Sequence, residues 1–263
     1  MQSVLLQTSD LSAWVTRLWW PVLRIGGFVA TAPIINQPAV PGRVKIALTV
    51  GLAFALAPLA RVPADLSIFS GTGVLAAVHE VLIGVAIGLI VQLAFEALEF
   101  AGQSISTSMG LGFATLVDPQ HGASTPVLGQ LFSIVGLLAY LAINGHLLLI
   151  GSLAHSFETL PVGAPTVDRD LLYTMATWGG RILESGVLIA LPALIALVII
   201  NLAIGVVSRA APQLHLFGIG FTLALLGGFF VLIVGLDGLA SAISALLQGA
   251  LEAARNLTTS AVH

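Results

Sequence analysis

The chain has 263 residues, of which 57% are hydrophobic and only 8% are charged, and its formal net charge is −3 at pH 7. A soluble domain carries about 25% charged residues, so this chain cannot cover a globular surface and is predicted to be an integral membrane protein. The small acidic excess offers no basic face to nucleic acid, and the lack of cysteine excludes disulfides and thiolate metal sites. Residues 1–14 have no basic segment and no small-residue cleavage site, so no removable signal is expected.

Six apolar runs follow one another, at Ala13–Ala32, Val44–Ala60, Val74–Ala101, Val127–Phe157, Leu171–Val207 and Leu216–Ala254. A membrane-spanning helix needs about 20 residues, and the last four runs exceed one straight span. We expect breaks in three of them, at 144–146, at Pro192, and at Gly227-Gly228 and Asp237. The predicted fold is all-α, one membrane domain over residues 1–263, made of kinked helices and half-helix hairpins. Broken backbone in lipid needs cover from protein or water, so the chain is expected to have neighbours.

The positive-inside rule leaves the membrane orientation open. With six spans, the basic residues divide equally between the two sides, as Arg43, Lys45 and Arg209 against Arg61, Arg169 and Arg255.

Small residues recur at a spacing that suits close helix packing. Gly102, Ser106, Gly110 and Ala114 are four apart, and so are Gly84 and Gly88. On a helix such a stripe lets another backbone approach closely. It fits packing within the chain or a contact with another subunit.

Ionisable side chains lie in or beside the apolar runs, where each is costly and is a functional candidate. They are Arg17, Arg24, His79, Glu80, Glu96, Glu99, Arg181, Glu184, Arg209 and Asp237. Glu96 and Glu99 have no basic residue near them in the sequence, so we expect them to face water or to meet an arginine from elsewhere. Arg17 and Arg24, which share one helix face, are plausible partners within the chain or in another subunit. Arg181 and Glu184 are three apart and can form a pair. Asp237 could carry a proton, although one carboxylate makes no relay.

No catalytic motif stands in the sequence. His79-Glu80 begins like the zinc motif H-E-x-x-H, but position 83 is Ile. The nucleophile elbow G-x-S-x-G and the phosphate-binding G-x-x-x-x-G-K-[ST] are absent. We therefore expect no catalysis, no metal and no cofactor.

Five stretches together resemble the FliR family of flagellar type III export proteins, called SctT in injectisomes. They are "TAPIINQPAVPGRVKIAL" (31–48), "HEVLIGVAIG" (79–88), "MGLGFATLVDPQHGASTPVLGQ" (109–130), "NGHLLLIGSLAHSFETLPVG" (144–163) and "NLAIGVVSRAAPQLHLFGIGF" (201–221). In order and spacing they cover nearly the whole chain. His215 and Thr222 depart from the family pattern, which tends to have Asn and Pro there.

The resemblance implies a structural and gating subunit of the export channel for unfolded flagellar proteins. It implies a spiral helical assembly with FliP-like and FliQ-like subunits and a contact to an FlhB-like subunit. The place would be the bacterial inner membrane, at the flagellar basal body; flagellar and injectisome cargo are not distinguished. A secondary transporter of a small solute or ion is the alternative, because broken helices with midplane charges also mark such sites. A membrane scaffold without a pore would leave residues 107–125 unexplained.

The stretch "TSMGLGFATLVDPQHGAST" (107–125) alternates apolar residues with glycine, at Met109, Gly110, Leu111, Gly112 and Phe113. An apolar constriction can hold back water and ions by dewetting, and glycine allows unusual backbone dihedrals. The family resemblance implies that the matching loop helps to plug the channel. The competing interpretation is that residues 107–117 end the preceding helix and pack inside the subunit.

Two further places carry expected roles. Asp118-Pro119 and Gly122 are predicted to end the apolar part of this stretch with a fixed turn. Arg209 at a helix end, followed by Pro212, is predicted to separate the last two segments and to present a charge at a subunit boundary. An ordinary interfacial turn with a snorkelling arginine explains the same pattern.

Overall fold

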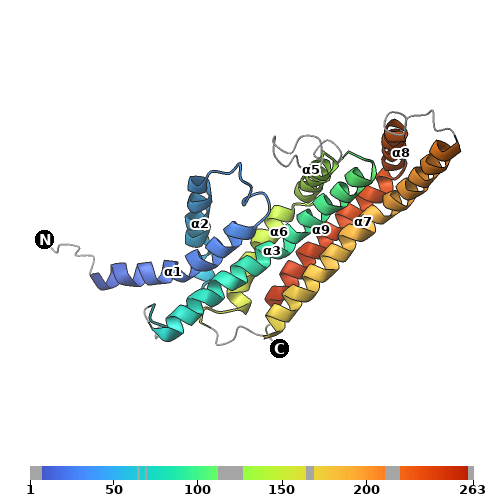
Figure 1. Ribbon diagram of the computed structural model, residues 1–263. Helices are drawn as coiled ribbons and strands as arrows, with labels where there is room; N and C mark the ends of the chain where they lie inside the picture. The colour runs from blue at the N-terminus through green and yellow to red at the C-terminus, as the bar shows by residue number, and fades with distance from the viewer. Residues whose placement is uncertain are drawn as a thin grey trace. The chain divides into compact units, whose positions relative to one another are not determined.

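The computed structural model describes residues 8–63, 66–68, 70–111, 127–163, 169–210 and 220–259 (Figure 1). The described residues form eight α-helices and one 3₁₀ turn and include no strand. The elements are α1 (Thr8–Thr31), α2 (Gly42–Leu56), η1 (Ala57–Leu59), α3 (Gly71–Ser108), α5 (Val127–Ala142), α6 (Gly145–Thr159), α7 (Arg169–Ala210), α8 (Phe221–Val234) and α9 (Leu236–Thr259). The predicted all-α class is confirmed.

Three of the described helices are long and apolar enough to cross a bilayer, at Gly42–Leu59, Gly71–Ser108 and Met175–Ala210. Two helix pairs, α5 with α6 and α8 with α9, are each bent by 66°, and counting each pair as one span raises the number to five. The predicted membrane protein with broken helices is thus confirmed. The predicted first span is not among these helices, because Arg17 and Arg24 lower the hydropathy of α1.

The breaks agree with the sequence in one place and differ in others. Asn144 separates α5 from α6 with a left-handed φ of 55°, a conformation that asparagine tolerates. The break before α9 lies at Gly235, beside Asp237, whereas Gly227-Gly228 lies inside α8. Pro192 lies inside α7, which continues from Arg169 to Ala210. A helix break at Pro192 or at Gly227-Gly228, as half-helix hairpins need, is therefore wrong, because helices in membranes tolerate both residue types. A kink at these residues stays a prediction.

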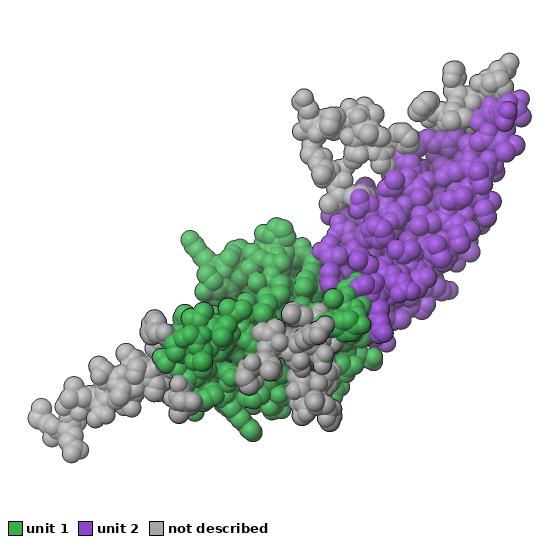
Figure 2. All heavy atoms as spheres, turned by 60° about the horizontal axis from the view of Figure 1, so that its bottom comes forward, with its two compact units in different colours: residues 1–92, 144–179, 250–263 green, residues 93–143, 180–249 purple. Residues whose placement is uncertain are grey.

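The chain divides into two compact units, coloured separately in Figure 2. Unit 1 consists of residues 1–92, 144–179 and 250–263, and unit 2 of residues 93–143 and 180–249. Helices α3, α7 and α9 each contribute residues to both.

In unit 1, glycines bring α1 and α3 into backbone contact. A Cβ on Gly84 would overlap the carbonyl oxygen of Arg24, and one on Gly88 would overlap Thr31 Oγ1. The Thr31 hydroxyl also lies 3.2 Å from the carbonyl oxygen of Val85, to which it can donate a hydrogen bond. One small core in this unit is formed by Trp20, Ala76 and Val162 with their apolar neighbours.

In unit 2, the second half of α3 packs against α5 and α7 through small residues. A Cβ on Gly102 would meet the backbone of Leu128 and Gly129, and one on Gly186 would meet Ala97. Gly84, Gly88 and Gly102 thus serve packing within the chain, which confirms that interpretation for these three. Ala114 lies outside the described residues.

Candidate functional site

The first site is the buried guanidinium of Arg24, where α1 crosses α3. Glu80, Gly84 and Gly88 are four residues apart and therefore share one face of α3. The glycines on this face let α1 approach until Arg24 reaches Glu80. Both charged side chains are fully buried.

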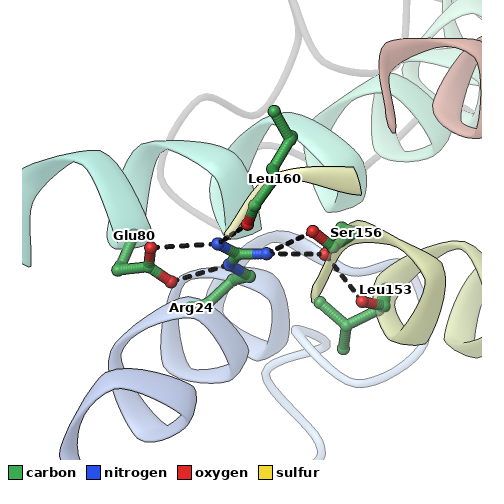
Figure 3. A network of polar contacts seen from close by, with 5 residues as sticks. All are labelled: Arg24, Glu80, Leu153, Ser156 and Leu160. Carbon is green, nitrogen blue, oxygen red and sulfur yellow. Dashed lines mark hydrogen bonds and ion pairs between the residues drawn. The ribbon is translucent and has the colours of Figure 1, made fainter. Parts of the chain in front are cut away.

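The Arg24 guanidinium donates to five acceptors (Figure 3). Its Nε and Nη2 lie 2.7 and 2.9 Å from the two carboxylate oxygens of Glu80. Nη1 lies 2.7 Å from the carbonyl oxygen of Ser156 and 3.1 Å from its hydroxyl, and Nη2 lies 2.8 Å from the carbonyl oxygen of Leu160. Arginine has five N–H donors, so every one of them finds a partner. The ring of Phe157 covers the group, with its centroid 4.4 Å from Cζ.

In this network, a side chain of α1 donates hydrogen bonds to main-chain carbonyls at the end of α6. The last carbonyls of a helix have no partner inside it and carry a partial negative charge. Arg24 donates to the carbonyl of Leu160, which directly follows α6, and adds a second donor to the carbonyl of Ser156, which also accepts from the Leu160 amide at 3.0 Å. The Ser156 hydroxyl completes the network by donating to the carbonyl oxygen of Leu153 at 2.6 Å. One side chain of α1 therefore holds α3 and α6 together.

Arg24 pairs with Glu80 and not with Glu96 or Glu99, so the alternative in which Arg24 meets one of these two residues is wrong. Helix α1 ends at Thr31, beside Val85 and Gly88, so it does not extend along α3 as far as these acidic residues. Sequence reasoning missed Ser156 and Leu160 because Arg24 binds their main-chain oxygens, which any residue supplies. The sequence signal for the pair was an arginine in the first apolar run and a glutamate in the third.

Among the other predicted ionisable residues, His79 of α3 is buried, and the rest are exposed or half-buried. Arg17 and Glu96 are exposed, and Glu99 is half-buried. The same is true of the charges of α7 and α9, where the exposed residues are Arg181, Glu184, Arg209 and Asp237. Pro212 lies outside the described residues. Among the described residues, no three His, Asp or Glu are grouped so that they could hold a metal.

The second site is the end of α3, where the glycine-rich stretch begins. Gly110 has a φ of 84°, the Leu111 amide donates to Ser106 O at 3.0 Å, and the Gly110 amide donates to Thr107 O at 3.0 Å. This pair of bonds around a left-handed glycine is a Schellman motif, a common helix end. Met109, just before the glycine, is fully buried and contacts Gly228 of α8. The expectation that the Met109 side chain lines the constriction together with Leu111 and Phe113 is therefore wrong for Met109, which packs inside the subunit.

The structure thus places Met109, Gly110 and Leu111 at a defined helix end. The remaining predicted residues of the stretch lie outside the described residues, namely Gly112, Phe113, Asp118, Pro119 and Gly122.

Comparison with known proteins gives the family. The model of "Bacterial export proteins, family 1" matches residues 15–250. The flagellar biosynthetic protein FliR of Escherichia coli (strain K12) is 41% identical over 217 residues, 82% of each chain. The protein of the same name from Pectobacterium carotovorum subsp. carotovorum is 40% identical over 224 residues, 85% of each chain, and that from Bacillus subtilis (strain 168) is 30% identical over 238 residues, 89% of this chain and 92% of the relative. The predicted resemblance is confirmed, and the chain belongs to family 1 of the bacterial export proteins.

Proposed function

We propose that the chain is a structural and gating subunit of the flagellar type III export channel. It assembles with FliP-like and FliQ-like subunits, contacts an FlhB-like subunit, and lies in the inner membrane at the flagellar basal body. Unfolded flagellar proteins pass through the assembled channel. Family membership supports the export role, and the names of the relatives support the flagellar setting.

The observation that carries the assembly is the mixed surface of α7. Only 17% of its most apolar window is buried in this chain, against 56% for α3. The uncovered surface includes apolar side chains such as Ile199 and Leu202 and the charged Arg181, Glu184 and Arg209. A charge that faces lipid is costly, so a helix that exposes both kinds fits contact with protein or water better than contact with lipid alone.

The proposed plug comprises residues 109–113. The buried Met109 attaches it to the folded subunit, and the left-handed Gly110 turns the chain away from α3. In the proposal Leu111 and Phe113 supply apolar side chains that exclude water from an idle channel. Asp118-Pro119 and Gly122 end this segment with a turn.

The secondary-transporter alternative has less support. Its substrate would need charged groups with open hydrogen-bonding capacity inside the membrane. Arg24 and Glu80 are fully buried, and the five N–H donors of Arg24 are already occupied. The pair connects helices α1 and α3, and no N–H group of Arg24 remains free to bind a solute.

Producing the chain alone and together with FliP-like and FliQ-like subunits tests the assembly. We expect the lone chain to aggregate or be degraded, because α7 leaves its mixed face uncovered, and co-production to yield a stable complex. Size-exclusion chromatography in detergent measures both. A long-lived, monodisperse lone monomer would contradict the proposal, and a gain in its stability from a small solute would favour a transporter.

Opening the channel tests the plug. Deleting residues 109–113, or changing Phe113→Asp, should make cells that overproduce the assembled complex leak ions, because an apolar constriction is lost or becomes wet. Membrane conductance or the efflux of a small dye measures the leak. The matched control is Phe113→Leu, which keeps an apolar side chain at the same position. A deletion variant that assembles, exports normally and stays tight would remove the plug from the proposal.

A further inference from the structure

We infer that Asn201 of α7 and Gly228 of α8 are positioning residues that fix the end of α3, and with it the point from which the glycine-rich segment starts. The inference rests on the proposed function in one respect, since residues 109–111 begin the proposed plug. Its geometry involves described residues only.

The last four carbonyls of α3 are all satisfied. Three of them accept from the chain's own next residues: Ile105 from Met109 at 2.9 Å, Ser106 from Leu111 at 3.0 Å and Thr107 from Gly110 at 3.0 Å. The fourth, the carbonyl of Ser108, lies 3.1 Å from Nδ2 of Asn201, which donates to it from α7. A local Schellman motif thus satisfies two carbonyls, and another helix supplies the last bond.

Asn201 is an unusual residue for its place. It lies in the stretch Met175–Ala210, which is long and apolar enough to cross a bilayer, and in the single chain it is exposed, as is its neighbour Leu202. An amide in such a helix is costly unless it is hydrogen-bonded, and asparagine often bonds across to a second helix there. The hydrogen bond from Asn201 to the carbonyl of Ser108 gives this amide a partner on a second helix.

Gly228 fixes the neighbouring residue from the other side. A Cβ at this position would lie 2.5 to 2.7 Å from three atoms of the Met109 side chain. Met109 is fully buried, so it has little freedom to withdraw. Glycine inside a helix costs conformational stability, yet here it provides the room in which Met109 sits.

Helices α7 and α8 therefore hold α3 at two consecutive residues, Ser108 and Met109. Immediately after them, Gly110 takes its φ of 84° and redirects the chain. The redirection begins from a point fixed by three helices, so the direction in which the chain leaves α3 is set by Asn201 and Gly228.

The chain has no cysteine, so Leu111→Cys creates a unique reactive thiol at this helix end. We would measure its labelling by a maleimide in membranes that contain the assembled complex. Asn201→Leu and Gly228→Ala in this background should raise the labelling rate roughly three- to tenfold, the factor that corresponds to one lost hydrogen bond or contact. Gly205→Ala is the control, because a Cβ at this position of α7 meets nothing within 4 Å. Asn201→Gln keeps an amide donor and should partly restore slow labelling.

Unchanged labelling in both variants overturns the inference, and so does loss of the variants from the membrane without rescue by Asn201→Gln. Conductance is recorded on the same membranes, with the 109–113 deletion as reference. If the deletion does not leak, the proposed plug fails, while the labelling rates still decide whether Asn201 and Gly228 hold the helix end. If the deletion leaks but neither variant raises the labelling rate, only the inference fails.

Discussion

At the scale of single residues, Arg24 stands out among the described residues because its fully buried side chain donates five hydrogen bonds. A buried ion pair is weak evidence for stability, because desolvation offsets the attraction between the charges. Hydrogen bonds to two main-chain carbonyls and one hydroxyl, and contact with an aromatic ring, further stabilise the buried guanidinium of Arg24. Its removal leaves Glu80 buried without its charge partner and takes one donor each from the carbonyls of Ser156 and Leu160 at the end of α6.

Changing Arg24→Leu should destabilise the protein by about 3–5 kcal/mol, the usual cost of breaking one side of a buried pair. The amount of protein in the membrane and the temperature at which the purified complex aggregates measure the effect. Arg17→Leu is the matched control, since Arg17 lies on the same helix but is exposed, and its loss should change little. Arg24→Lys should keep only part of the stability that Arg24→Leu loses, because an ammonium cannot reproduce the planar five-donor geometry.

The double change of Arg24→Leu with Glu80→Leu separates charge pairing from packing. Two apolar residues leave no unpaired charge, so the double variant should be more stable than Arg24→Leu alone. A double variant that is less stable than the single one would show that Glu80 does not depend on Arg24.

At the scale of helices, the contact between α1 and α3 depends on glycine. Changing Gly84→Ala places a methyl group on the backbone of Arg24 and Phe28, so the two helices must separate. Overpacking of this kind costs about 1–3 kcal/mol and should also weaken the Arg24–Glu80 pair. Thermal stability of the complex measures the loss.

The same substitution at Gly51 of α2 is the control and has the opposite expected sign. A Cβ there meets nothing within 4 Å, and alanine favours a helix over glycine by about 0.5–1 kcal/mol. Equal effects at Gly84 and Gly51 would contradict the close packing of α1 on α3.

The sequence predicted helices better than it predicted their breaks and partners. Apolar runs mark helices in lipid, so the all-α class and the break at Asn144 could be read directly. The predictions at Pro192 and Gly228 were wrong because residues that end helices in soluble proteins are tolerated inside membrane helices, where a glycine can also make room for a neighbouring side chain. The partner of Arg24 could not be found either, since pairing depends on where α1 ends along α3, and no spacing within one helix records that.

At the scale of the whole molecule, much apolar surface stays uncovered in the single chain. The most apolar window of Gly42–Leu59 is 11% buried and that of Met175–Ala210 is 17% buried. Part of this surface suits lipid, and apolarity alone does not distinguish lipid from another subunit. Charged residues on the same helices do distinguish them, because only protein or water satisfies a charge.

Arg209 offers the sharpest test of that distinction. It lies exposed in the last turn of α7, where it could either snorkel to the membrane surface or contact another subunit. A snorkelling role needs only a long positive side chain, so Arg209→Lys would then behave as the parent and Arg209→Ala would reduce membrane insertion. A subunit contact that uses the planar guanidinium predicts a different pattern, in which both variants insert normally and both lower recovery of the complex with FliP-like and FliQ-like subunits.

We expect this second pattern, with a larger loss of complex for Arg209→Ala than for Arg209→Lys. Resistance to carbonate extraction measures insertion, and affinity purification through a tagged partner measures assembly. Full recovery of the complex with Arg209→Ala would remove the residue from the interface.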